Sequence, residues 1–128
     1  MKKVLIDSSV WIGYFKKAND LVALNELIDK DRICTNKIIL AELIPYLEEK
    51  KENELIDILQ SIEEIPLEID WEKIIDYQIK NLRNNIRKIG IPDLIILQNV
   101  IENDLELFTL DKHFSLMKGV HKFNLFRK

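Results

Sequence analysis

Short runs of apolar residues alternate along the chain with stretches in which apolar residues recur every three or four positions. The short runs predict buried strands at 4–6, 32–35, 65–67, 105–110 and 122–126. The three-and-four spacing predicts helices at 10–15, 21–28, 38–43, 53–62, 71–89, 92–101 and 112–117. Strands separated by helices form a parallel sheet that is covered on both faces. We therefore expect an α/β fold with three layers, α/β/α, and a mostly parallel central sheet.

Several residues mark where the predicted helices begin and end. Asn19, Asn36 and Asp70 each precede a helical pattern and are suited to cap it. Gly90 follows the long pattern that begins after Asp70, and glycine commonly ends a helix. Pro45 lacks an amide N–H, so the helix that starts after Asn36 is expected to kink or stop nearby.

Length and composition indicate one domain inside the cell. The 128 residues, 47% of them hydrophobic, suffice for one core and are too few for two, so we expect a single domain over 1–128. The first apolar run is broken at Asp7 and is too short for a signal peptide, which predicts a cytoplasmic protein. No apolar stretch approaches the roughly 20 residues that span a bilayer, so no membrane is expected. The only cysteine, Cys34, cannot form an internal disulfide and is expected in the core.

Charge is distributed unevenly along the chain. The net charge is −3, but residues 1–79 hold 10 Lys or Arg and 17 Asp or Glu (net −7), whereas residues 80–128 hold 9 and 5 (net +4). Two ordinary solvated faces would explain this difference. A basic C-terminal surface that contacts phosphate groups would explain it equally well.

Four carboxylates stand within hydrophobic sequence, whereas most of the other 18 acidic residues lie in polar stretches. Asp7 and Asp111 follow predicted strands, Asp93 lies in the first turn of a predicted helix, and Glu42 lies within another. Ligands collect beyond the carboxyl ends of parallel strands, and a buried carboxylate is costly without a partner. Carboxylates without Cys or His neighbours favour Mg²⁺ or Mn²⁺ over zinc. We therefore expect a divalent cation where these four residues meet.

Most of these residues also have a simple structural explanation. The helix dipole favours Asp93 at a helix start, Asp111 could cap the turn that follows it, and Glu42 could face solvent. The two serines after Asp7 could cap the first helix. Asp7 has no comparable explanation, because an acid at the end of a buried strand stabilises nothing obvious.

Taken together, four segments resemble the motifs of a nuclease family. The segments are "VLIDSSVWIGYF", "NKIILAEL", "GIPDLIIL" and "LFTLDKHF". Their order and separations are similar to those of the PIN-domain ribonucleases, above all the small VapC toxins of VapBC toxin–antitoxin pairs. The resemblance runs from about residue 3 to residue 116 and matches all four carboxylates to the family's acidic positions. It also matches Ser9 and Thr109 to the family's hydroxyl positions. The chain departs from the family at Leu97 and Gln98, which replace small residues, and this departure affects packing more than chemistry.

The resemblance implies a metal-dependent endoribonuclease. In it, Asp7, Asp93 and Asp111 share a cation, Mg²⁺ or Mn²⁺, and Glu42 completes the site or orients a metal-bound water. Such a cation lowers the pKa of the water, orients it in line with a phosphodiester and stabilises the charge that develops. Hydrolysis of RNA would leave a 3′-hydroxyl and a 5′-phosphate. The two hydroxyl groups would hydrogen-bond an acid or the scissile phosphate.

RNA must also be held by basic residues, because an acidic pocket repels it until metal is bound. We expect Arg83, Arg87 and Lys112 to contact the RNA backbone, together with other lysines of the basic half. His113 lies two residues from Asp111, but no Ser or Cys nucleophile accompanies it. We therefore expect it to be a solvated surface residue.

The resemblance further implies a homodimer and a cognate antitoxin whose C-terminal segment lies across the site. Two alternatives within the same fold stay open: a non-toxin RNA-processing nuclease, and a catalytically silent module that binds RNA or protein. Two other classes fit less well. A phosphoacceptor receiver domain would have an acid pair after the first strand, and a haloacid-dehalogenase-like phosphatase would have a second aspartate where Ser9 stands.

Overall fold

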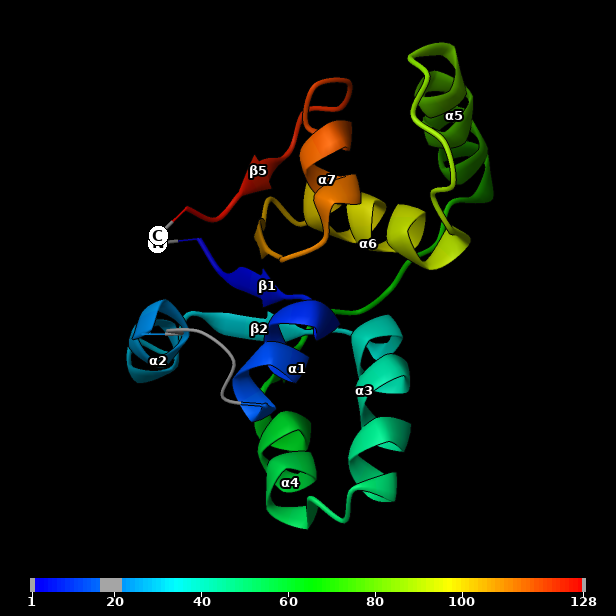
Figure 1. Cartoon of the computed structure of the whole chain (residues 1–128). Coiled ribbons are helices and arrows are strands. Elements are labelled where there is room, and N and C mark those ends of the chain that lie inside the picture. The colour runs from blue at the N-terminus through cyan, green and yellow to red at the C-terminus, as the bar shows by residue number, and fades with distance from the viewer. Residues whose placement is uncertain (1, 17–21, 128) are drawn as a thin grey trace.

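Within the residues that the computed structural model describes, 2–16 and 22–127, five parallel strands form one sheet (Figure 1). The strands lie in the order β3-β2-β1-β4-β5, and each neighbouring pair is parallel. Their bounds are β1 (Val4–Ile6), β2 (Ile33–Thr35), β3 (Glu63–Glu64), β4 (Glu106–Phe108) and β5 (Asn124–Leu125). The expectation of a mostly parallel central sheet is confirmed.

Helices cover the sheet on both faces. Helices α1 to α4 lie on one face, and α5 to α7 lie on the other (Figure 1). Their bounds are α1 (Ser8–Phe15), α2 (Val22–Asp29), α3 (Lys37–Glu49), α4 (Asn53–Ser61), α5 (Trp71–Arg83), α6 (Ile91–Glu102) and α7 (Lys112–Met117). The predicted three-layer α/β/α architecture is therefore confirmed. None of the described helices is long and apolar enough to cross a membrane.

The chain changes direction across the sheet between β1 and β4. From β1 it adds β2 and then β3 on one side, and after crossing back it adds β4 and β5 on the other side. Right-handed crossovers in opposite directions place their helices on opposite faces, which explains the two helix groups. The loops that leave β1 and β4 therefore diverge, and ligands of such sheets bind in the crevice between them.

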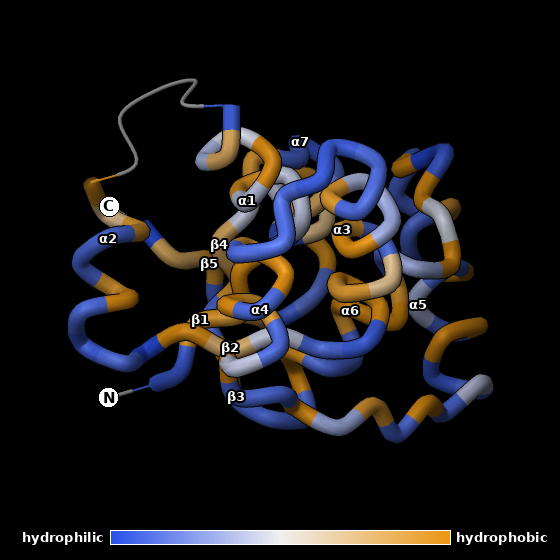
Figure 2. Tube along the Cα trace, turned by 90° about the horizontal axis from the view of Figure 1, so that it is seen from below, coloured by the Kyte–Doolittle hydropathy of each residue, from blue (hydrophilic) through white to orange (hydrophobic). Residues whose placement is uncertain are grey.

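Strand β1 and helix α6 form the centre of the core. Val4, Leu5 and Ile6 are fully buried because helices cover both faces of the sheet. Helix α6 is buried on all sides, and every residue from 94 to 100 is buried. Figure 2 shows the hydrophobic residues of β1 and β2 inside the molecule and mainly hydrophilic residues along the outer side of α2. Two candidate acids, Asp7 and Asp93, are thus attached to the most deeply buried elements.

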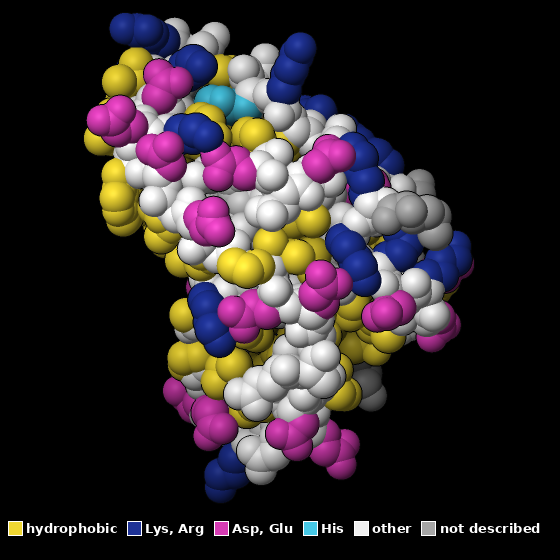
Figure 3. Space-filling model, turned by 180° about the vertical axis from the view of Figure 1, so that it is seen from behind, with side chains coloured by type: hydrophobic (Ala, Val, Ile, Leu, Met, Phe, Trp, Pro, Cys, Tyr) yellow, Lys and Arg dark blue, Asp and Glu magenta, His cyan; other side chains and the backbone are white. Residues whose placement is uncertain are grey.

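Helix α5 exposes an apolar face. Trp71, Ile75, Ile79 and Leu82 lie on one side of the helix at spacings of three and four, and each is between 40% and 59% exposed. We call these four residues the α5 apolar face. The space-filling view from behind shows hydrophobic side chains along the edge of the molecule that α5 forms (Figure 3).

The long helix predicted to end at Gly90 stops earlier. Asn85 adopts the left-handed conformation, with φ 63°, directly after Asn84, the C-cap of α5. The amides of Asn85 and Ile86 donate to the carbonyls of Leu82 and Asn81, at 3.1 and 2.8 Å. This is the hydrogen-bond pattern of a Schellman helix end. The prediction was therefore wrong in its second half, because an asparagine pair ends the helix before the glycine.

Two other predicted boundaries were wrong. Helix α3 continues four residues beyond Pro45, where a stop or kink was expected. Pro45 and Ala41, whose carbonyl loses its partner, are both exposed, so water can satisfy that carbonyl. The strand predicted at 65–67 pairs two residues earlier, as β3. β3 is a solvent-exposed edge strand, and hydrogen bonds to β2 set its position rather than its own apolar run.

The predicted caps are confirmed for two helices. The Asn36 side chain accepts from the amide of Ile39 at 3.0 Å at the start of α3. Asp70 accepts from two amides at the start of α5, at 3.1 and 3.3 Å. At α1 the cap position belongs to Asp7, without a side-chain capping bond, and not to the serines that follow it. Asn19, the cap expected for α2, lies outside the described residues.

Candidate active site

Four elements bring the four candidate carboxylates to the carboxyl edge of the sheet. Asp7 follows β1 directly, and Asp111 follows β4 after a two-residue loop. Glu42 lies in the second turn of α3, and Asp93 lies in the first turn of α6. The charges of Asp7, Asp93 and Asp111 all raise the pKa of Glu42, so the four side chains lie in one region. β1 and β4 are the strands at which the chain changes direction, so the acids occupy the crevice expected for a ligand.

Two hydroxyl groups fix the Asp7 carboxylate. Its Oδ2 atom accepts hydrogen bonds from Ser9 Oγ at 2.7 Å and from Thr109 Oγ1 at 2.8 Å. Ser9 Oγ in turn accepts from the Leu110 amide, and Thr109 Oγ1 accepts from the Asp111 amide, both at 3.0 Å. Asp7 is only 5% exposed. The network therefore ties the end of β1 to the loop after β4 and holds Asp7 in one orientation.

A buried amide pair positions the helices that carry Glu42 and Asp93. Asn36, at the start of α3, donates from Nδ2 to the side-chain oxygen of Asn99 on α6 at 2.9 Å. Asn99 also donates to the Pro66 carbonyl at 3.1 Å. Both side chains are buried, so the contact fixes the spacing of the two helices. The neighbouring Gln98 bonds the loop before α5.

The carboxylates perturb one another. Burial, followed by the charges of Asp111 and Asp7, raises the pKa of Asp93 from 3.8 to about 6, while nearby His113 opposes the rise. The pKa of Glu42 is also raised, first by partial removal from water and then by the charges of the three aspartates. Glu42 is exposed to solvent, which was one explanation of its place in the sequence, and it is close enough to the three aspartates for their charges to raise its pKa. Carboxylates that resist ionisation together are suited to bind a cation.

Three side chains could hold one metal ion. Each of Asp93, Asp111 and His113 offers a ligand atom, and these atoms all lie within 4.8 Å of one another. His113 is half-buried, with Nδ1 3.4 Å from Asp111 Oδ1. The His113 side chain is 39% exposed, in keeping with the expected surface position, and its ring lies beside the acids. Its position in the "DKH" tripeptide was the available signal, but the direction of its ring could not be read from the sequence.

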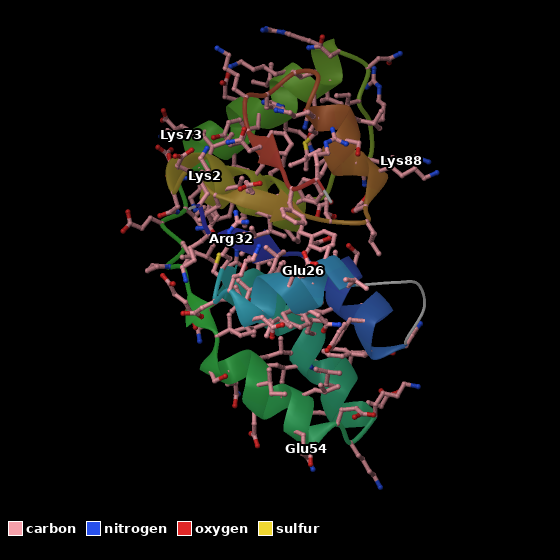
Figure 4. The ribbon with its side chains drawn as sticks, turned by 90° about the vertical axis from the view of Figure 1, so that its left-hand side faces the viewer. Lys2, Glu26, Arg32, Glu54, Lys73 and Lys88 are labelled. Atoms are coloured by element: carbon pink, nitrogen blue, oxygen red, sulfur yellow. The ribbon has the colours of Figure 1, made fainter. Side chains whose placement is uncertain are left out.

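The basic residues expected to hold RNA occupy different positions. Lys112 is the first residue of α7 and directly follows Asp111, so it lies beside the acids. Arg83 ends α5, and Arg87 is exposed in the loop between α5 and α6. Among the contacts of the described residues, none joins these arginines to the acids, and their role stays a prediction. In the same loop, the Lys88 side chain extends into solvent (Figure 4).

The amino-terminal edge of the sheet carries a different arrangement of charge. Arg32 donates to the Lys2 carbonyl and forms an ion pair with Glu106 at 3.0 Å. Figure 4 shows Arg32 and Lys2 close together at this edge. These charges are paired, whereas those at the carboxyl edge repel one another. The amino-terminal edge is therefore a structural edge, whereas the carboxyl edge has the features of a ligand site.

Comparisons with known proteins agree with this geometry. A family model described as PIN domain matches residues 4–120. The chain is similar in structure to a VapBC2 complex from Rickettsia felis bound to a DNA fragment from its promoter (TM-score 0.75, 21% identity, 96% of each chain). It is also similar to VapBC-5 from Mycobacterium tuberculosis (TM-score 0.74, 20% identity, 100% of each chain).

A third similar structure has a described RNA target. It is VapC20 from Mycobacterium tuberculosis, described as a toxin that cleaves the sarcin–ricin loop. The TM-score is 0.62 at 10% identity, over 89% of this chain and 94% of that one. At sequence identities this low, the structural similarity shows a shared fold. A search of curated proteins found no significant match.

Proposed function

The chain belongs to the PIN-domain family of nucleases, and from that premise we propose that it is a metal-dependent endoribonuclease of the VapC type. The observation that carries this proposal is the convergence of four carboxylates at the carboxyl edge, where burial and mutual repulsion raise the pKa of Asp93 to about 6. A divalent cation would neutralise these charges and create the site that phosphodiester hydrolysis needs.

Each acid would have a distinct part in this reaction. Asp93 and Asp111 would hold Mg²⁺ or Mn²⁺, which supplies the positive charge that activates water and stabilises the phosphate as it reacts. Asp7, whose carboxylate is held in one orientation by two hydroxyl groups, would add its negative charge to the site. Glu42 faces solvent on the open side, where it can orient the attacking water and accept its proton.

RNA is the proposed substrate. The cleavage of an RNA loop that is described for VapC20 supports this class, as does the basic half of the chain. Lys112 beside the acids, with Arg83 and Arg87 on the same half, would contact the phosphate backbone. Cleavage would leave a 3′-hydroxyl and a 5′-phosphate.

The test is cleavage of a structured RNA by the purified protein. Wild type should cleave with Mn²⁺ or Mg²⁺ and be inert in EDTA. Asp7→Asn and Asp93→Asn should each lose at least about a hundredfold in rate, or about 2.7 kcal/mol of transition-state stabilisation. Asp57→Asn, on the exposed face of α4, is the matched control and should cleave normally. Folded wild type that never cleaves RNA would favour the silent binding module.

We propose that the chain forms a homodimer through the α5 apolar face. These four large side chains would meet water in a monomer, and burying them stabilises association. Beside this face, the first half of α5 carries Glu72, Lys73 and Asp76, and the second half carries Lys80 and Arg83. Asp76 and Lys80 already form an ion pair within the helix, with Oδ2 and Nζ 3.2 Å apart. In a pair of α5 helices related by a two-fold axis, the same apolar side chains of both chains would meet.

A pair of matched substitutions tests the dimer. Ile75 is 59% exposed in the α5 apolar face, and Ile58 is 51% exposed on α4. Ile75→Glu should halve the mass measured by light scattering at micromolar concentration, whereas Ile58→Glu should leave it unchanged. A wild-type mass of one chain would contradict the proposal.

We also propose a cognate antitoxin, because similar structures include VapBC complexes. A groove of about 530 Å³ between α3 and α4 is lined by apolar residues such as Leu40, Ile44 and Ile62. Glu42 lies on the same stretch of α3, so a segment in the groove could continue across the acids. Co-expression with the product of a small neighbouring reading frame should yield a complex that Ile44→Asp disrupts. A locus without such a frame would favour an RNA-processing nuclease.

A further inference from the structure

The imidazole of His113 faces the same point as two acids of the site. Its Nδ1 atom lies 3.4 Å from Asp111 Oδ1. Ligand atoms of His113, Asp111 and Asp93 lie within 4.8 Å of one another, and all three residues are half-buried. They come from two separate elements, the start of α6 and the start of α7. The fold therefore adds one nitrogen donor to a site that otherwise consists of oxygen donors.

The spacing fits shared coordination better than a direct hydrogen bond. A charge-assisted N–H···O bond is usually about 2.7–2.9 Å long, so 3.4 Å is too long for a strong bond between these two groups. Two ligands that are each about 2.1 Å from one ion, at an angle of 90–110°, lie about 3.0–3.4 Å apart. The observed separation falls within this range. A capping bond from the His113 amide to Asp111 Oδ1, at 2.9 Å, holds the two residues in this arrangement.

We propose that His113 is a ligand of the metal site and strengthens the preference of the site for Mn²⁺ over Mg²⁺. The inference rests on the metal-dependent function proposed above. Mg²⁺ favours oxygen ligands, whereas imidazole suits later divalent ions of the transition series. Mn²⁺ accepts both donor types. The oxygen-only site expected from the sequence would show a weaker preference for Mn²⁺, so His113 is the residue that strengthens it.

Metal binding without RNA tests this proposal directly. Titration calorimetry on wild type should give tighter binding of Mn²⁺ than of Mg²⁺. His113→Phe keeps a planar ring without nitrogen and should weaken Mn²⁺ binding at least about tenfold, with Mg²⁺ binding changed much less. His113→Asp replaces the nitrogen donor by oxygen and should narrow the difference between the two ions. Neither change touches the amide that bonds Asp111.

The second histidine of the chain supplies an internal control. His121 is buried, and its Nε2 lies 2.8 Å from Asn81 Oδ1. With substoichiometric Mn²⁺, the ring resonances of His113 should broaden before those of His121. Unbroadened His113 signals, together with wild-type Mn²⁺ affinity in both variants, would overturn the inference and leave the acidic site intact. A wild-type protein that binds neither ion would overturn the metal-dependent function itself, and this inference with it.

Discussion

Replacing Asp93 by asparagine should make the metal-free protein more stable. Burial and the charges of Asp111 and Asp7 raise the pKa of the Asp93 carboxyl from 3.8 to about 6, so the folded state resists its ionisation. Asparagine has nearly the same shape and carries no charge. The substitution therefore removes the repulsion while the packing at the start of α6 is kept.

The size of the effect follows from the pKa difference. A difference of about 2 units corresponds to about 3 kcal/mol of unfolding free energy at high pH. Asp93 is only half-buried, and solvent screening reduces this to about 1.5 kcal/mol. Loss of the carboxylate from the first turn of α6 removes about 0.5 kcal/mol of helix-dipole stabilisation. We expect a net increase of about 1 kcal/mol, or about 3 °C in Tm.

The stabilisation should depend on pH in one direction. Because the pKa of Asp93 is raised, the folded protein binds this proton more tightly than the unfolded chain does. The destabilisation of wild type is therefore complete above about pH 6 and disappears as the pH falls toward 4. The difference between the variant and wild type should be largest at pH 8 and about half as large at pH 5.

Chemical denaturation in EDTA at the two pH values measures this difference. Asp57→Asn removes the same charge from the exposed face of α4 and should change the unfolding free energy by less than about 0.5 kcal/mol. Mn²⁺ should then stabilise wild type more than the Asp93 variant. The reasoning is refuted if Asp93→Asn leaves stability at pH 8 unchanged or lower, or if the gap does not shrink at pH 5.

Three further predictions concern the support of the site. Thr109→Val removes one hydrogen bond from Asp7, and the rate of RNA cleavage in Mn²⁺ should fall about 10- to 100-fold; Ser9→Ala should act in the same direction. Asn81→Leu leaves the buried His121 ring nitrogen without its partner, and urea denaturation should show a loss of about 1–3 kcal/mol with normal Mn²⁺ binding. Arg87→Glu should weaken RNA binding and lower the slope of log K against log salt by about one or more, with stability unchanged.

The fold could be predicted largely because its signals are local. Each central strand is an apolar run, and most helices show the three-and-four spacing along their own sequence. The predictions were wrong where a contact with a distant segment or the conformation of the backbone determines the structure. Strand β3 has exposed side chains and exists because β2 offers it hydrogen bonds. The end of α5 depends on the left-handed backbone of Asn85, which the apolar spacing cannot reveal.

The candidate site shows the same division. Asp7 and Asp111 could be found because each follows a buried strand, and parallel strands bring their ends to one edge. The proposed ligand role of His113 could not be predicted, because it depends on how the ring lies relative to Asp93, which is twenty residues away in the chain. The hydroxyls were assigned to an acid or to phosphate, and the structure gives them to Asp7.

The four carboxylates differ in how well their surroundings stabilise them, and this difference explains how the fold accommodates four acids at one site. Asp7 is the most buried of the four, yet two hydroxyls satisfy its charged oxygen and hold it in place. Among the described residues, no side chain donates a hydrogen bond to the Asp93 carboxylate, and its pKa rises instead. Attraction for a cation should therefore come mainly from Asp93 and its neighbours, while Asp7 fixes the geometry. One acid therefore fixes the geometry of the site, and the others supply its affinity for a cation. The acids that destabilise the metal-free protein are those whose mutual repulsion a metal ion would remove.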